Sequence, residues 1–210
     1  MNSQEMEYTH MLLINFTGAP GAGKSTMAAG LFHQLKTRHW NVELVTEYTK
    51  ELLLTQDTWS LSDELLIFTE KYRRIKKLES VDLVITDSPL INSVIYDNDQ
   101  FGPAAGALYE AVARSFDSLY FAVDRVSPYI PVGRMPDADA ADQAGEAIVS
   151  HLRRLNAPLY RVKGTDAAIP HILDVIESQA RSRGLAPLLE EKDQDPTDDP
   201  RVISLDTVRP

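Results

Sequence analysis

The sequence predicts an α/β protein in which helices cover both faces of a five-stranded parallel sheet, in three layers. Three observations lead to this prediction. Apolar runs of strand length alternate with helical patterns between residues 10 and 183. A glycine-rich stretch at residues 18–26 stands between the first of these runs and the first helical pattern. The total of 210 residues suits one domain with a single sizeable core.

The glycine-rich stretch matches the pattern G-x-x-x-x-G-K-[ST] in full and predicts a site for ATP. Its members are Gly18, Ala19, Pro20, Gly21, Ala22, Gly23, Lys24, Ser25 and Thr26. The glycines let backbone N–H groups turn toward a phosphate, Lys24 adds a positive charge for the β and γ phosphates, and Ser25 offers a hydroxyl to Mg²⁺. The apolar run at residues 10–16 and the helical spacing over residues 26–36 place this loop between a strand and a helix. An ordinary glycine-rich turn is the alternative.

Residues 41–48 alternate in character, carry β-branched side chains, and predict a second strand that ends at Glu47. In an open parallel sheet, ligands bind at the carboxyl ends of the strands, which would bring Glu47 near the phosphates. The alternative is a solvated charge that opens the next helix. Residues 50–59 follow as a short helix or loop that could cover a pocket.

A long helix is predicted after a cap at Ser60 or Ser62. Its apolar positions, at spacings of three and four, are Leu61, Leu65, Phe68, Tyr72, Ile75 and Leu78. The other face carries a basic cluster of Lys71, Arg73, Arg74, Lys76 and Lys77. This cluster is either a solvated helix surface or a contact for substrate phosphates or a nucleic-acid backbone. Arg73 and Arg74 are the candidate substrate residues because guanidinium groups bind phosphate in a fork.

The third strand, predicted from residue 81, is apolar and ends in an acidic residue, Asp87. A carboxylate at this place, together with a phosphate loop, is typical of a magnesium site, where it acts on Mg²⁺ directly or through water. We therefore predict that Asp87 and Ser25 hold the metal. A helix cap helped by Ser88 and Pro89 is the alternative.

The middle of the chain predicts helices at residues 90–96 and 104–115 and a fourth strand at residues 119–123. The segment 125–137 contains three prolines, a glycine and two arginines. This composition fits a lid that closes over the transferring phosphate, in which Arg125 or Arg134 offsets charge in the transition state. A simple connecting loop is the alternative.

The last third predicts two more helices and an edge strand. The helices are at residues 137–155 and 167–183, and the strand is at residues 158–162. Lys163-Gly164 follows that strand, where many such folds hold the adenine ring. Residues 185–210, with many prolines and acids, are expected to be a poorly structured extension, although Ile203 and Leu205 could dock on the body.

The composition excludes several classes of protein. A net charge of −10 argues against a protein that coats nucleic acid through bulk electrostatics, while local DNA contact stays open. The chain has no cysteine, so disulfides, thiolate metal sites and a cysteine nucleophile are excluded, and a metal would be held by oxygen. No apolar run approaches the ~18 residues of a membrane-spanning helix. The N-terminus also lacks the order of a signal peptide, in which charged residues are followed by apolar ones. We expect a cytoplasmic protein without a membrane partner.

Four stretches together carry a resemblance to a known family: residues 18–26, 46–48, 86–89 and 125–134. With them, the sequence resembles the thymidylate-kinase-like branch of the phosphate-loop kinases. More narrowly, it resembles a set of bacteriophage ATPases, some of which are DNA kinases. Those kinases phosphorylate 5-hydroxymethyl-deoxyuridine, a step toward hypermodified thymidines in phage genomes.

The resemblance spans about residues 10–180 and implies a P-loop NTPase fold, with a kinase domain at 1–184, a lid near 125–137 and an extension at 185–210. It also implies that the loop binds the nucleotide, that Asp87 binds Mg²⁺ and that Glu47 lies near the acceptor hydroxyl. Where thymidylate kinases carry an Asp-Arg-Tyr type of triplet, this sequence has Asp87-Ser88-Pro89 and lacks the arginine. An acceptor with a bare hydroxyl is therefore favoured over a monophosphate.

The predicted function is transfer of the γ-phosphoryl group of ATP to a hydroxyl. Glu47 would accept the proton, while Lys24, Mg²⁺ and a lid arginine would stabilise the charge. The expected acceptor is 5-hydroxymethyl-deoxyuridine in phage DNA, in the host cytoplasm. A kinase for a free nucleoside or nucleoside monophosphate, and an NTP-driven switch ATPase without an acceptor, are the alternatives. The oligomeric state is not determined by the sequence, and a homodimer stays open.

Overall fold

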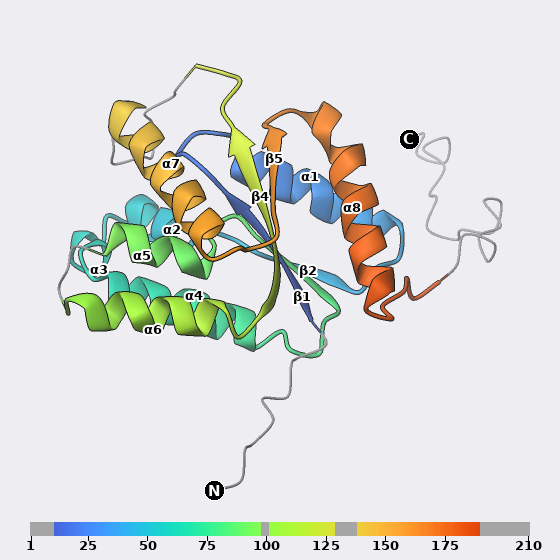
Figure 1. Cartoon of the computed structure of the whole chain (residues 1–210), viewed down its shortest axis with the longest axis horizontal. Coiled ribbons are helices and arrows are strands. Elements are labelled where there is room, and N and C mark those ends of the chain that lie inside the picture. Colours follow the sequence, from blue (N-terminus) through green and yellow to red (C-terminus); the bar gives the residue numbers. More distant parts are fainter. Residues whose placement is uncertain (1–10, 98–100, 129–137, 190–210) are drawn as a thin grey trace, which may run out of the picture.

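A computed structural model of the chain describes residues 11–97, 101–128 and 138–189. Its centre is a five-stranded sheet with the strand order β2-β3-β1-β4-β5 (Figure 1). The strands are β1 (Leu12–Thr17), β2 (Val42–Val45), β3 (Leu83–Thr86), β4 (Asp117–Asp124) and β5 (Leu159–Lys163). Neighbouring strands all pair in parallel. The predicted five-stranded parallel sheet, with the last strand at its edge, is confirmed.

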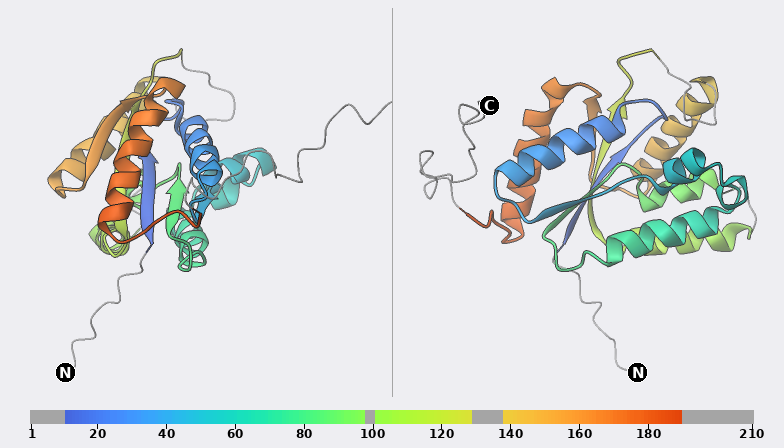
Figure 2. Two further views of the ribbon diagram at one scale, coloured as in Figure 1. Left: turned by 90° about the vertical axis from the view of Figure 1, so that its right-hand side faces the viewer. Right: turned by 180° about the vertical axis from the view of Figure 1, so that it is seen from behind.

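Helices join the strands and cover both faces of the sheet. They are α1 (Lys24–Thr37), α2 (Tyr48–Thr55), α3 (Thr58–Leu61), α4 (Glu64–Lys76), α5 (Ser93–Tyr96), α6 (Pro103–Ala113), α7 (Ala138–Arg154) and α8 (Ile169–Ser182). Single 3₁₀ turns at Leu90–Asn92 and Asp166–Ala168 lead into α5 and α8. Figures 1 and 2 show α1 and α8 together on one side of the sheet and α4 to α7 on the other. The predicted three layers are therefore present.

The strand side chains alternate between two cores because successive residues of a strand point to opposite faces. Leu12, Ile14 and Phe16 of β1 pack with residues of α1 and α8. Met11 and Leu13 pack on the other face with residues of α4, α6 and α7. The central strand β1 is consequently buried along its whole length. The loop that leaves its carboxyl end starts from a tightly packed base.

Some element ends differ from the predictions. β2 ends at Val45, so Glu47 is the residue before the first turn of α2 rather than the last residue of the strand. α4 begins after Asp63, whose side chain accepts a hydrogen bond from the Leu66 N–H at 3.0 Å. Neither predicted serine caps this helix, because an extra turn, α3, precedes it and an aspartate caps a helix equally well. Residues 50–59 contribute to two helices, α2 and α3.

Part of the predictions lies outside the described residues. This holds for most of the lid, with Arg134, and for the end of the chain from residue 190, with Ile203 and Leu205. In the part that the structure describes, no helix combines the length and the apolar character needed to cross a membrane.

His151 of α7 is expected to make the stability of the fold depend on pH. Its side chain is buried, and Arg154 donates a hydrogen bond to its Nδ1, which requires a neutral ring. Burial and Arg154 lower the pKa of His151 below the ordinary value of 6.5, although Glu110, 3.4 Å from Nε2, opposes this effect. The unfolded chain therefore takes up this proton at a higher pH than the folded chain. Stability should be lost as the pH falls below about 6.5.

The test is the urea midpoint at about pH 7.5 and about pH 5.5. We expect the wild type to lose more stability across this interval than His151→Gln. The control is His171→Gln, on the exposed side of α8, which should behave as the wild type does. Equal losses in H151Q and the wild type would show that His151 does not carry the effect.

Candidate active site

The loop of residues 18–23 leaves the carboxyl end of β1 and turns directly into α1. Gly18, Gly21 and Gly23 have φ angles of 118°, 80° and 97°, a region that favours glycine. A Cβ at Gly18 would also lie 2.8 Å from the carbonyl oxygen of Val123 in the adjacent strand β4. The loop therefore brings its backbone N–H groups to the N-terminus of α1, where the helix dipole favours an anion.

Lys24 is the first residue of α1, and its side chain folds back over the loop. Its Nζ donates hydrogen bonds to the carbonyl oxygens of Gly18 and Ala19 at 3.1 and 3.0 Å. Ser25 and Thr26 follow in the first turn of the helix and are exposed. The nine predicted nucleotide-binding residues thus form one continuous loop and helix start.

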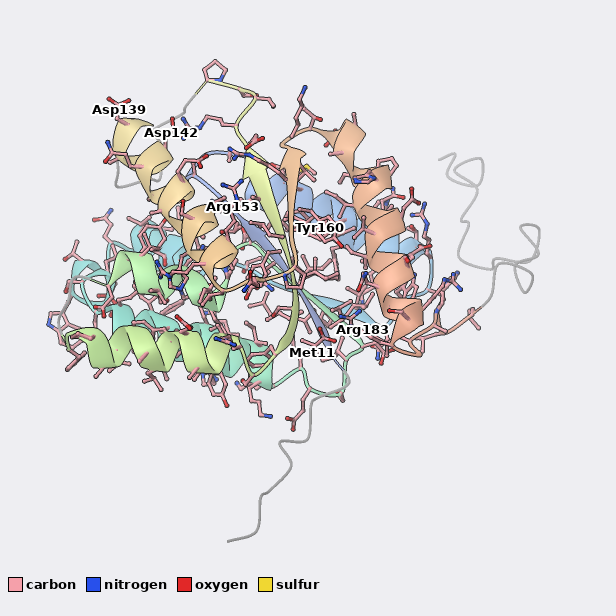
Figure 3. The ribbon with its side chains drawn as sticks, in the orientation of Figure 1. Met11, Asp139, Asp142, Arg153, Tyr160 and Arg183 are labelled. Atoms are coloured by element: carbon pink, nitrogen blue, oxygen red, sulfur yellow. The ribbon has the colours of Figure 1, made fainter. Side chains whose placement is uncertain are left out.

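Two segments from the β4 and β5 side of the sheet pack against this loop. Arg125, just after β4, donates to the carbonyl oxygen of Pro20 at 2.9 Å and pairs with Asp142 of α7 at 2.8 Å. Figure 3 shows Asp142 near the start of α7, close to the end of β4. Gly164 follows β5, and a Cβ there would lie 2.3 Å from the carbonyl oxygen of Ala22. These close approaches support the loop from the side of β4 and β5.

Gly164→Ala is expected to destabilise the fold by about 1–3 kcal/mol and to weaken ATP binding, because the loop backbone must move away from the new methyl group. The matched control is Gly106→Ala in α6, where an added Cβ meets nothing within 4 Å. This control should keep ATP affinity and stabilise the helix by up to about 1 kcal/mol. Urea unfolding and titration with a fluorescent ATP analogue measure both effects. A G164A protein with wild-type midpoint and affinity would contradict the role of this contact.

Asp87 follows β3, which pairs with β1 in the middle of the sheet. Its side chain is 4 % exposed, and its Oδ1 atom has no hydrogen-bond partner among the described residues. A buried carboxylate oxygen without a partner is costly unless a cation or a donor joins it. Asp87 therefore fits the predicted metal-binding role. It lies at the carboxyl end of β3, beside the end of β1 from which the phosphate loop starts.

The pair of Asp87 and Ser25 also suits Mg²⁺ in its chemistry. Both are oxygen ligands, and Mg²⁺ in phosphotransferases is held by one or two protein oxygens together with nucleotide phosphates and water. Within residues 11–97, 101–128 and 138–189, no group of three histidine or acidic side chains forms a metal site of its own. A metal at this site would bind together with the nucleotide.

Glu47 and Asp87 share one site with the loop lysine. Burial raises the pKa of the Glu47 carboxyl group, Lys24 opposes this effect and Asp87 adds to it. Tyr96 of α5, which the sequence did not single out, interacts with Glu47 as well. Loss of solvent around its phenol, followed by the charge of Glu47, raises the pKa of Tyr96 to about 12. The fold thus brings Lys24, Glu47 and Asp87 together from the ends of three neighbouring strands.

The prediction for Lys71 was wrong. Its side chain is 4 % exposed and does not belong to the polar face of α4. Its Nζ donates to Ser93 Oγ at 2.9 Å and lies 3.5 Å from Glu64 Oε1. The signal was available, since Lys71 stands three residues after Phe68 and four before Ile75, on the same helical face. The apolar positions of the helix were identified from apolar residues alone, so a lysine on the same face was not counted among them. Lys71 was therefore assigned to the basic cluster with the arginines that follow it.

Arg73 and Arg74 pair with carboxylates of α4 and α2. The Nε and Nη2 atoms of Arg73 donate to the two carboxylate oxygens of Glu70, each at 2.6 Å. Arg74 contacts Glu51 of α2 at 2.5 Å, and its guanidinium lies 4.8 Å from the ring centre of Tyr48. The contacts of Arg74 tie α4 to α2, the helix that follows Glu47, and none of these contacts involves the phosphate loop.

A cavity of about 540 Å³ lies near the start of β4, at the end of the sheet opposite to the phosphate loop. Its lining includes Phe116, Ser118, Leu152 and Arg183. Figure 3 shows Arg183 and Met11 far from Asp142, which marks the end with the phosphate loop. This cavity is therefore separate from the candidate active site.

A phosphate loop between β1 and α1, a buried acid after β3 and the strand order β2-β3-β1-β4-β5 together define a P-loop NTPase with a nucleotide-kinase-like fold. The chain belongs to the AAA_28 family, described as an AAA domain, whose model matches residues 13–168. The comparison with curated proteins gives no match.

Several solved structures share this fold at low identity. A NadR protein in complex with NAD and AMP-PNP is 14 % identical, with a TM-score of 0.58 over 82 % of this chain and 50 % of that chain. Thymidylate kinase from Ehrlichia chaffeensis is 17 % identical, with a TM-score of 0.55 over 80 % and 98 %. Deoxyadenosine kinase from M. mycoides with bound dATP is 17 % identical, with a TM-score of 0.51 over 79 % and 99 %. The chain spans about half the length of the NadR protein.

Proposed function

We propose that the protein is an ATP-dependent phosphotransferase that moves the γ-phosphoryl group to a hydroxyl. The observation that carries the proposal is the grouping of two acids with different surroundings, Glu47 and Asp87, beside the lysine of a phosphate loop. A kinase that phosphorylates a hydroxyl uses one acid for the metal and another for the proton. The likeness of the fold to two nucleotide and nucleoside kinases supports the proposal.

The loop of residues 18–26 is the proposed site for the triphosphate. Lys24, which contacts two loop carbonyl oxygens, would exchange these contacts for the β and γ phosphates. The Ser25 hydroxyl and the Asp87 carboxylate are the proposed protein ligands of Mg²⁺. When bound, this ion neutralises charge on the transferring phosphoryl group.

In the proposed transfer, the acceptor hydroxyl gives its proton to a carboxylate oxygen of Glu47, and its oxygen forms the new bond to the γ-phosphorus. The bond between the γ-phosphorus and the bridging oxygen breaks, and ADP leaves with that electron pair. Arg125, which already contacts the carbonyl oxygen of Pro20, and Arg134 of the lid are the groups proposed to offset charge on the γ-phosphoryl oxygens.

The acceptor we propose is a neutral hydroxyl rather than a phosphate. Three cations of α4 that could clamp a monophosphate have carboxylate partners. The pairs are Lys71 with Glu64, Arg73 with Glu70, and Arg74 with Glu51. A monophosphate would have to compete with these carboxylates, and a bare hydroxyl would not. From the sequence resemblance, the proposed hydroxyl is that of 5-hydroxymethyl-deoxyuridine in phage DNA.

A free deoxynucleoside is the second candidate acceptor. The deoxyadenosine kinase structure supports it, because the similarity extends over 99 % of that chain. A free deoxynucleoside and a hydroxymethyl base in DNA both present a neutral hydroxyl, so the base Glu47 would serve either one.

The experiment is a transfer assay with γ-labelled ATP and purified protein. The acceptors offered are DNA containing 5-hydroxymethyl-deoxyuridine, the same DNA with thymidine, free nucleosides, nucleoside monophosphates, and none. We expect label in the hydroxymethyl DNA and none in the thymidine control. Label confined to nucleosides would support the second candidate, and label in monophosphates would contradict the neutral acceptor. Release of phosphate without any labelled acceptor would instead indicate a switch ATPase.

A further inference from the structure

The first half of α7 packs directly against the phosphate loop. Gly145 of this helix is buried, and a Cβ there would lie 2.7 Å from the backbone nitrogen of Ala19. Only a residue without a side chain allows the helix and the loop to approach so closely. Asp142 stands three residues before Gly145 and is its neighbour on the helix surface. The helix therefore presents the carboxylate of Asp142 beside the loop.

Asp142 binds Arg125 through both of its carboxylate oxygens. Its Oδ1 lies 2.8 Å from Nη2 of Arg125, and its Oδ2 accepts a hydrogen bond from Nη1 at 3.3 Å. The Arg125 side chain is 15 % exposed, whereas that of Asp142 is 59 % exposed. The same Nη2 atom donates to the carbonyl oxygen of Pro20 at 2.9 Å. Asp142 thus holds the guanidinium group that contacts the loop.

The contact with Pro20 fixes the orientation of one peptide unit of the loop. In a planar trans peptide, the carbonyl group and the N–H of the next residue point in opposite directions. Because the Pro20 carbonyl points to Arg125, the N–H of Gly21 points away from Arg125. Backbone N–H groups are what a loop of this kind offers to a phosphate. Arg125 therefore determines the direction of one of these donors.

We propose that Asp142 is a positioning residue of the ATP site: acting through Arg125, it holds the Pro20–Gly21 peptide in the orientation that binds a phosphate. The inference rests on the proposed function for the triphosphate as ligand, but it requires no acceptor and no transfer. It also determines the sign of an effect. Asp142 is a negative charge beside a site for a polyanion, so on charge alone its removal would tighten binding. A positioning role requires the opposite.

The first test compares Asp142→Asn with Glu146→Gln, using calorimetric titration with ATP and with inorganic tripolyphosphate. Glu146 lies one helical turn after Asp142, and its side chain is 60 % exposed and pairs with Arg161 of β5 at 2.7 Å. Each substitution removes one negative charge from the same helix, but only D142N releases the arginine that contacts the loop.

We expect D142N to bind both ligands about 5- to 10-fold more weakly than the wild type, because a charge-assisted contact that orients the loop is lost. E146Q should bind them as the wild type does or slightly more tightly. Binding by D142N that equals or exceeds that of the wild type would overturn the proposal, and so would an equal loss in E146Q.

The second test is a double-mutant cycle that examines the route through Arg125. Arg125→Met removes the guanidinium group, so adding Asp142→Asn to it should cause no further loss of tripolyphosphate affinity. Additive losses would show that Asp142 acts by another route and would overturn the proposal. Asp142→Glu keeps the carboxylate and should recover most of the affinity that D142N loses, whereas a D142E protein as weak as D142N would also contradict the proposal. If the wild type binds ATP but transfers phosphate to no acceptor, the proposed function fails, and the affinities still decide the role of Asp142.

Discussion

Glu47→Gln is expected to lower acceptor-dependent phosphoryl transfer by about 100- to 10,000-fold, with ATP binding retained. Glutamine keeps the shape of the side chain but cannot take the proton of the acceptor hydroxyl. In the wild type, transfer should also decline as the pH falls through the raised pKa of Glu47, because the carboxylate is the form that accepts a proton. Single-turnover kinetics with labelled ATP measure the loss, and titration with a fluorescent ATP analogue measures the binding.

The same substitution should stabilise the protein at neutral and alkaline pH. Burial, assisted by Asp87 and opposed by Lys24, raises the pKa of Glu47 above 4.5, so the folded chain holds this proton more tightly than the unfolded chain. The stability that Glu47 contributes is therefore present below pH 4.5 and is lost as the pH rises through the folded-state pKa. Glutamine is neutral throughout. The urea midpoint of E47Q should exceed that of the wild type at about pH 8, and the difference should vanish at about pH 4.

Glu43→Gln is the matched control for this prediction. Glu43 lies in β2, close to Glu47 in sequence, and forms a surface ion pair with Lys36 at 2.9 Å. Its substitution should leave transfer unchanged and alter stability little, as is usual for exposed pairs. Full transfer activity in E47Q, with ATP still bound, would exclude Glu47 as the base.

Asp87→Asn is expected to separate activity from stability. The charge neutralisation that a bound metal supplies is worth several kcal/mol, so transfer in the presence of Mg²⁺ should fall by about 100-fold or more. Without nucleotide and metal, the urea midpoint should stay the same or rise, because the buried Oδ1 of Asp87 lacks a hydrogen-bond partner among the described residues and its charge lies near that of Glu47. The two readouts should therefore move independently or in opposite directions.

The control is Asp82→Asn. Asp82 directly precedes the first residue of β3, at the end of the strand away from Asp87, and its substitution should keep both activity and stability. A variant D87N that unfolds more easily than the wild type would show that the carboxylate supports the fold. A D87N protein that transfers phosphate normally at low Mg²⁺ would remove Asp87 from the metal site.

The patterns that predicted the fold are local. The strand β1, the glycine-rich turn and the helix α1 are adjacent in sequence, and each has a strong signal of its own: an apolar run, a glycine motif and helical spacing. The rule that parallel strands meet at their carboxyl ends then placed Glu47 and Asp87 near this loop without any further information. Their position near the loop was predicted even though β2 ends two residues earlier than expected.

Charges on a helix were harder to assign. Lys71 and Arg74 are three residues apart in one basic cluster, yet the first is buried against Ser93 and the second pairs with Glu51 of another helix. The difference depends on which neighbours the helix meets, and those neighbours lie about 20 residues away in either direction along the chain. The spacing within α4 places Lys71 on the apolar face, but it does not identify the residues that Lys71 and Arg74 contact.

The sequence by itself therefore determined the class of protein, the phosphate loop, and two acids at the ends of neighbouring strands, because these features depend on local pattern and on the geometry common to parallel sheets. The tertiary structure decided which distant segments meet: Arg125 with the loop at Pro20, Gly164 against Ala22, and Lys71 with Ser93 in the segment after Asp87. Hydrogen bonds and steric contacts of this kind act over only a few ångströms. They therefore depend on how distant segments pack, which a linear pattern does not encode.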